Sequence, residues 1–225
     1  MKRRPWPIAT LIFGLATLAV FIAFGMLPEV KGVYDPGAVG AEVSAFQRAE
    51  TMADLARVFG EPADPARLAA MTAINRLDLY AFIPAYTLFL VLAAIMLATG
   101  TRSLIAWAAI LFALIGAGAD AIETTAQLRV TQDYANAAAQ LPIAPWHWMK
   151  YFCLALHGAM LAVFCCVSRK RWILAAVAFA PFVCVSLAAA RLAPPSLYSA
   201  AFGVFWIALL VIAVMELVRA KGEPA

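Results

Sequence analysis

Two carboxylates stand at the end of an otherwise apolar stretch of the chain, residues 104–123. If this stretch is helical, Asp120 and Glu123 share one face, because they are three residues apart. A carboxylate inside a membrane costs about 2–3 kcal/mol or more unless it faces a partner or a wet cavity. The pair therefore indicates either a polar site or an ion pair within a helical bundle.

Other side chains able to bind a ligand or transfer protons are expected near the same membrane face. Asp78 precedes the second apolar run, and Arg191 follows the fifth. Lys150 and His157 share a face of the fourth run, because seven residues make two helical turns, whereas His147 is placed on a different face. The predicted ligand-binding residues are Asp120, Glu123, His157, Asp78, Lys150 and Arg191.

These residues allow more than one interpretation. His157 with the two carboxylates could form a metal or proton-transfer site, or a hydrogen-bonded staple that fixes helix register. Asp120 could instead form a buried ion pair with Lys150 or Arg191. The chain has two histidines and no His-x-x-x-His or Glu-x-x-His spacing, so neither a metal nor a cofactor is predicted. Signatures of ATP-driven and serine-hydrolase chemistry are also absent, and a catalytic role stays open.

The composition assigns the chain to the integral membrane proteins. It has 225 residues, of which 65% are hydrophobic and 13% charged, and no soluble domain of this size is so apolar. The apolar runs are continuous and approach the roughly 20 residues that cross a bilayer as a helix. The net charge of +4 comes from basic residues at helix ends, so nucleic acid is not an expected partner.

The predicted fold is an all-α bundle of six spans in one membrane domain, residues 1–225, with an extracytoplasmic helical cap between spans one and two. The third span carries a stripe of small residues that should let a neighbouring helix approach closely. The stripe consists of Ala109, Ala113, Gly116 and Ala117. The spans are predicted at about residues 8–27, 79–99, 104–123, 149–167, 172–190 and 196–218.

The cap is predicted over residues 28–77. Within it, Ala41 to Phe59 has the apolar spacing of one amphipathic helix. Asp64 is expected to cap a second helix with Pro65 in its first turn, and this helix can continue into span two. Pro84 should kink span two, because it frees the carbonyl of Tyr80.

The positive-inside rule predicts the orientation. With both termini in the cytoplasm, that side carries nine basic and two acidic residues, whereas the opposite side carries eight basic and eleven acidic ones. The predicted location is therefore the inner (plasma) membrane. Tryptophans 146 and 148 fit the aromatic belt at the opposite interface, and Glu216 should pair with Arg219.

The acidic motif resembles a pattern in uncharacterised bacterial polytopic membrane proteins. In these a Gly/Ala-rich span ends in Asp-x-x-Glu and is followed by an external helix and by a span that opens near a lysine. The resemblance covers Ala113 to His157, and Thr124 stands where those proteins often have Asn. It implies no activity.

Three functions fit these features. The first is a pocket, open to the outer leaflet, that binds or processes a lipid-like molecule. The second is a structural or accessory subunit, in which the acids are helix staples and the small stripe docks another membrane protein. The third is a small proton-coupled carrier, which would need acids near the bilayer midplane that spans one, five and six lack. The expected partners are thus the lipid bilayer, a lipid-like ligand or a membrane protein.

Overall fold

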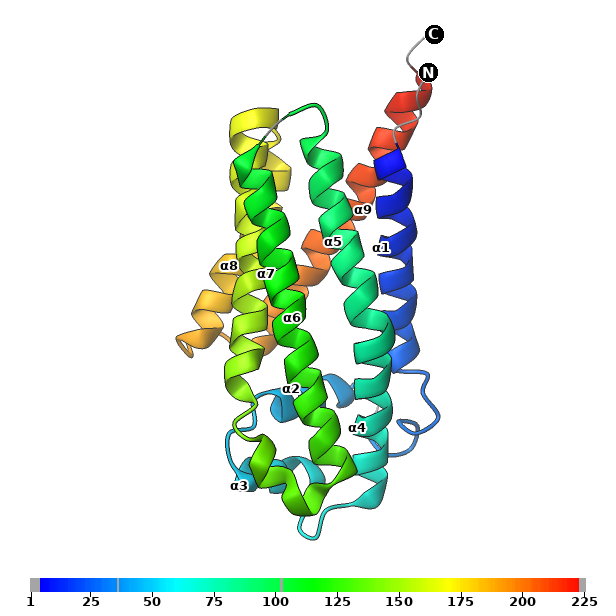
Figure 1. The fold of residues 1–225 in the computed structure, drawn as a ribbon, viewed down its shortest axis with the longest axis vertical. Coiled ribbons are helices and arrows are strands. Elements are labelled where there is room, and N and C mark those ends of the chain that lie inside the picture. The colour runs from blue at the N-terminus through cyan, green and yellow to red at the C-terminus, as the bar shows by residue number, and fades with distance from the viewer. Residues whose placement is uncertain (1–4, 36, 102, 223–225) are drawn as a thin grey trace. The chain divides into compact units, whose positions relative to one another are not determined.

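The computed structural model describes residues 5–35, 37–101 and 103–222, and no β-strand is present in these residues. Figure 1 shows the helices in chain order. The long helices are α1 (Pro5–Phe24), α5 (Ile83–Ala98), α6 (Leu104–Gln132), α7 (Ala144–Phe164), α8 (Trp172–Ala189) and α9 (Pro195–Gly222). The shorter ones are α2 (Val39–Gln47), α3 (Met52–Phe59) and α4 (Pro65–Leu77), with π-helical turns η1 (Asp78–Phe82) and η3 (Cys165–Arg169) and the 3-10 helix η2 (Tyr134–Gln140).

Six helices among the described residues are long and apolar enough to cross a membrane. This confirms the all-α class and the predicted number of spans. The candidate spans are Pro5–Phe24, Pro65–Ala98, Leu104–Gln132, Ala144–Arg169, Trp172–Ala189 and Pro195–Arg219. Several are longer than expected, because polar residues at their ends continue the helix. The inner membrane, the cytoplasmic termini and the location of residues 28–77 outside the membrane stay predictions.

The internal contacts divide the chain into two compact units. Unit 1 comprises residues 1–17, 85–117 and 151–225, whereas unit 2 comprises residues 18–84 and 118–150. Whether the whole chain acts as a single domain stays a prediction.

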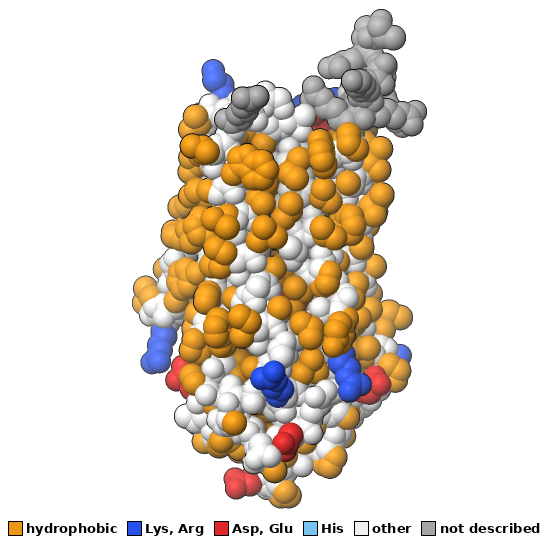
Figure 2. Space-filling view, viewed as in Figure 1, with side chains coloured by type: hydrophobic (Ala, Val, Ile, Leu, Met, Phe, Trp, Pro, Cys, Tyr) orange, Lys and Arg blue, Asp and Glu red, His pale blue; other side chains and the backbone are white. Residues whose placement is uncertain are grey.

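Unit 1 has the surface of a membrane bundle. Leu104 and Ile173 expose 86% and 85% of their area, which a surrounding lipid phase would cover. Figure 2 shows apolar side chains along its long helices. The first turn of α1 and the last turns of α9 lie at the same end of this unit, together with the α5–α6 and α7–α8 connections (Figure 1).

Small residues bring helices of unit 1 together. Ala109 and Ala113 of α6 are fully buried, and a Cβ added at Gly116 would lie 3.0 Å from the Leu154 side chain of α7. The expected close approach at the small stripe is therefore confirmed. The contact at Gly158 of α7 is tighter, because an added Cβ would collide with the carbonyl oxygen of Ala178 on α8.

Arginines tie the helix ends of unit 1. The Arg169 guanidinium donates hydrogen bonds to the carbonyl oxygens of Leu97 and Thr99, at 3.0 and 2.6 Å from its Nη2. The Leu97 carbonyl lies in the last turn of α5, where helix carbonyls lack a partner within the helix, and Thr99 directly follows α5. Glu216 pairs with Arg171 and, at 3.6 Å, with Arg219, so the predicted Glu216–Arg219 pair is confirmed.

Unit 2 has its own apolar core, to which α2, α3, α4, η2 and the C-terminal part of α6 contribute. Phe46 and Phe59 meet edge to face at 5.0 Å between ring centroids, and Val130 of α6 is fully buried among the same residues. The amide of Ile143 donates to the carbonyl oxygen of Ala49 at 2.9 Å. This bond fixes the start of α7 against the chain that follows α2.

The prediction of one helix over Ala41 to Phe59 is wrong. The structure has two helices with a break between Gln47 and Met52. Thr51 causes the break, because it caps α3: its hydroxyl accepts from the Asp54 amide, while the Asp54 carboxylate accepts from the Thr51 amide. In a continuous helix, carbonyl oxygens of the preceding turn would accept from these amides. In this reciprocal capping box, the side chains of Thr51 and Asp54 accept from them instead.

The helix that leads into the second span begins at the predicted cap. The Asp64 carboxylate accepts from the Ala66 amide at 2.8 Å, with Pro65 in the first turn. The helix then continues from Pro65 to Ala98 and contains the π-helical turn Asp78–Phe82. Tyr80 lies in this turn, so the helix departs from α-helical hydrogen bonding in the turn before Pro84. The kink expected at Pro84 stays a prediction.

The tight α7–α8 contact can be tested with Gly158→Ala. We expect a loss of about 1–3 kcal/mol of stability, because the obstructing atom belongs to the backbone and no rotamer change can move it. Thermal unfolding of the detergent-solubilised protein measures this loss. Gly203→Ala on α9 is the matched control, because its added methyl group would meet nothing within 4 Å. Equal stability of the two variants would contradict the close approach.

Candidate functional site

A buried lysine joins two helices in unit 2. Lys150, in the second turn of α7, places its Nζ atom 2.8 Å from Oδ1 of Asp120 and 2.7 Å from Oε2 of Glu123, both on α6. The three residues expose 0–4% of their surface. The predicted ion pair between Asp120 and Lys150 is therefore confirmed, and Glu123 shares the same ammonium group.

Two more polar side chains surround Glu123. The Gln127 amide donates to Oε1 of Glu123 at 3.2 Å, and Nδ1 of His147 lies 3.7 Å from the same oxygen. His147 is fully buried. The prediction that His147 lies on a different helix face from Lys150 is wrong, since it precedes Lys150 by three residues and approaches the same carboxylate.

Asp78 extends this group from the π-helical turn. Its Oδ2 atom accepts a hydrogen bond from the Thr124 hydroxyl at 3.0 Å, and Asp78 is partly exposed whereas Thr124 is buried. We define the ion cluster as Asp78, Asp120, Glu123, Thr124, Gln127, His147 and Lys150.

The ion cluster is rich in negative charge, with three carboxylates and one lysine. Buried charges are tolerated only when they are paired and hydrogen-bonded. Lys150 provides the charge for two carboxylates, while Gln127 and Thr124 donate neutral hydrogen bonds to Glu123 and Asp78. No set of three His, Cys, Asp or Glu side chains in the described part of the chain is arranged to hold a metal ion. The arrangement can hold α7 against α6 and can exchange protons among its carboxylates and His147.

The other two predicted site residues belong to unit 1. His157 is fully buried, and its Nδ1 atom lies 2.9 Å from the carbonyl oxygen of Ala109. That contact requires the hydrogen on Nδ1, so His157 fixes α7 to α6 in this unit as a staple would. Arg191 is exposed after α8, in the left-handed conformation with a φ of 61°.

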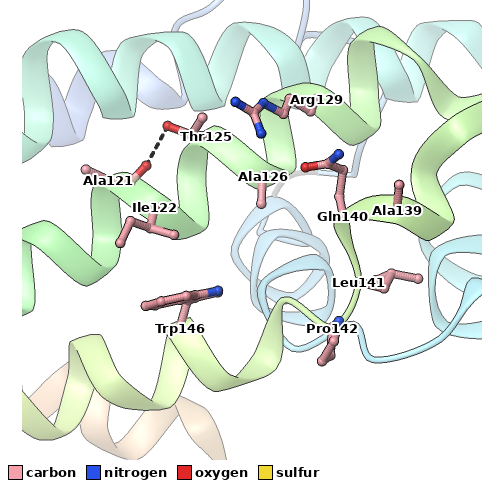
Figure 3. Close-up of a pocket in the computed structure, with 10 residues that line it drawn as sticks. All are labelled: Ala121, Ile122, Thr125, Ala126, Arg129, Ala139, Gln140, Leu141, Pro142 and Trp146. Atoms are coloured by element: carbon pink, nitrogen blue, oxygen red, sulfur yellow. Dashed lines mark hydrogen bonds between the residues drawn. The ribbon is translucent and has the colours of Figure 1, made fainter.

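A groove opens on another face of α6 in unit 2. Its volume is about 590 Å³. Figure 3 shows Ile122 of α6 and Trp146 of α7 pointing toward each other across it, and Arg129 and Gln140 together at its end. The full lining is Ala121, Ile122, Thr125, Ala126, Arg129, Ala139, Gln140, Leu141, Pro142 and Trp146.

A smaller hollow adjoins this groove. Its volume is about 260 Å³, and it is lined by Arg129, Gln132, Asp133, Asn136 and Gln140. All five side chains are polar, and two of them, Arg129 and Gln140, also line the groove. The groove and the hollow therefore form one amphipathic depression. We call its two parts the apolar groove and the polar hollow.

None of the six predicted ligand residues lines the apolar groove. Four of them lie in the ion cluster, which faces the other side of α6. The pattern that marks the groove is nevertheless present in the sequence: Ile122, Thr125 and Arg129 follow one another at intervals of three and four, which places them on one helix face. The partners from η2 and the following turn could not be inferred, because they are adjacent only in space.

No family model, curated protein or solved structure matches this chain. The resemblance of the Asp-x-x-Glu segment to bacterial membrane proteins stays a prediction.

Replacing Lys150 with Met should destabilise the protein strongly. Two buried carboxylates would lose their counter-charge, at a cost of about 3–5 kcal/mol. The apparent unfolding temperature in detergent measures the effect, and Lys31→Met, at an exposed position of the same unit, is the control.

A triple variant separates charge from packing. Asp120→Asn and Glu123→Gln added to Lys150→Met remove the unpaired charges, so we expect much of the lost stability to return. If the triple variant were no more stable than Lys150→Met, the ion pairs would not be the cause of the loss.

Proposed function

We propose that this membrane protein binds a lipid-like molecule in the apolar groove of unit 2. The observation that carries the proposal is that an apolar-walled groove and a wholly polar hollow share Arg129 and Gln140. A ligand that fills both must be apolar at one end and polar at the other. An amphipathic lipid has this property, and the bilayer supplies it.

The walls of the groove suit hydrocarbon. Ile122, Leu141 and Trp146 offer apolar surface, which an alkyl chain can contact by van der Waals packing without burying an unpaired polar group. The groove volume lies within the range of about 300–1,000 Å³ that is typical of ligand sites. Thr125 contributes little polarity, because its hydroxyl donates to the Ala121 carbonyl at 2.7 Å (Figure 3).

The ion cluster supports this site rather than contacting the ligand. Lys150 holds α7 to α6 through Asp120 and Glu123, and these helices carry Trp146 and Ile122, the two opposed walls of the groove. A binding site needs such rigid support to keep its walls at a fixed spacing. The proposal is one of binding, and it assigns no reaction.

Filling the groove should remove the bound lipid. We expect Ala126→Trp, which puts an indole into the groove, to lower the lipid retained after gentle detergent extraction by about tenfold, equivalent to about 1.4 kcal/mol. Native mass spectrometry measures the retained lipid. Ala53→Trp, at an exposed position on α3 outside the groove, should leave it unchanged. Equal retention by both variants would contradict the proposal.

A further inference from the structure

The polar hollow contains one cation and one anion in neighbouring helical turns. Arg129 stands in the last turn of α6, and Asp133 directly follows this helix. Both side chains are exposed. No ion pair joins them, and Arg129 has no carboxylate within 4 Å among the described residues. The hollow therefore offers two opposite charges to a ligand.

From this arrangement we infer that the polar hollow binds a phospholipid headgroup that carries both a phosphate and a primary ammonium group. The inference rests on the proposed function, since the acyl chains of this lipid would occupy the apolar groove. Arg129 lines both parts of the depression. It therefore lies where the phosphate, which joins acyl chains to headgroup, must be.

The guanidinium group suits the phosphate. Arginine offers five N–H donors in a planar fork and binds phosphate oxygens in pairs. Gln140 lies beside it at the boundary between groove and hollow (Figure 3), and its amide offers a further donor.

The far side of the hollow suits a primary ammonium. Asp133 accepts one hydrogen bond from the Asn136 amide, at 2.8 Å through Oδ2, and a carboxylate accepts several more. Gln132 and Asn136 add amide oxygens. An ammonium group with three N–H donors can use these acceptors.

The same lining disfavours the two common alternatives. A trimethylammonium headgroup has no N–H donor and is bound by aromatic cages, and no aromatic side chain lines the hollow. A purely anionic headgroup, such as phosphoglycerol, would leave Asp133 without a cationic partner and close to additional negative charge. The charges therefore favour a phosphoethanolamine-type headgroup over both.

The test compares three phospholipids with identical acyl chains. Phosphatidylethanolamine, phosphatidylcholine and phosphatidylglycerol are offered in equal amounts to the detergent-solubilised full chain, and the bound fraction of each is measured by native mass spectrometry. We expect the ethanolamine lipid to be bound about tenfold more than either competitor, the lower end of the range expected for a hydrogen bond to a charged group.

Two variants assign the charges. Asp133→Asn should abolish the preference for the ethanolamine lipid over the glycerol lipid, whereas Arg129→Gln should lower the retention of all three. Asp35→Asn and Arg76→Gln, at exposed positions of unit 2 that line neither the groove nor the hollow, should change nothing. All four positions are exposed, so folding should be maintained.

The outcomes separate the two proposals. If wild-type protein bound the three lipids equally and Ala126→Trp still reduced their retention, the headgroup inference would be overturned while the groove remained a lipid site. If Ala126→Trp retained as much lipid as wild type, the proposed function itself would fail. A preference that survived Asp133→Asn would also overturn the role of Asp133.

Discussion

The salt bridge from Lys150 to Asp120 and Glu123 is the constraint on which the rest of unit 2 depends. It joins the start of α7 to the C-terminal half of α6 through contacts of 2.8 and 2.7 Å, and all three residues are buried. Such a bond is strong only while every member is present, because a buried charge that loses its partner is costly. Helix α7 therefore cannot slide or rotate against α6 without exposing or unpairing these groups.

The C-terminal half of α6 has two polar faces with different roles. The buried face carries Asp120, Glu123, Thr124 and Gln127, and each of these side chains has a polar partner within the protein. Arg129 lies on another face and has no carboxylate partner among the described residues. It lines both the apolar groove and the polar hollow. A polar group that the fold has already paired stabilises the fold, whereas one that remains accessible is available to a ligand. This difference in accessibility is why the proposed binding function is assigned to the groove.

Close helix contacts in unit 1 follow a different principle. Gly116 lies where α6 meets α7, and Gly158 lies where α7 meets α8; neither has a side chain that would keep the helices apart. Such close approach matters because helices in a lipid phase associate through van der Waals packing rather than through hydrophobic exclusion from water. The buried His157 adds one hydrogen bond, to the carbonyl oxygen of Ala109. Unit 1 thus combines an apolar surface with contacts between small residues, and unit 2 combines an apolar core with a buried ion network.

The sequence by itself determined the all-α class, the six spans, the cap at Asp64 and the need of Asp120 for a cationic partner, which it left open between Lys150 and Arg191. Each follows from local spacing, from the length of an apolar run or from the need of a buried charge for a partner. The break at Thr51 was missed, because the apolar period continues across it while the capping box ends one helix and starts the next. Only the tertiary structure decided that His147 joins the ion cluster and that η2 returns to face Arg129. These contacts join segments that are distant in the chain, and the periodicity within one helix does not specify where a neighbouring helix lies.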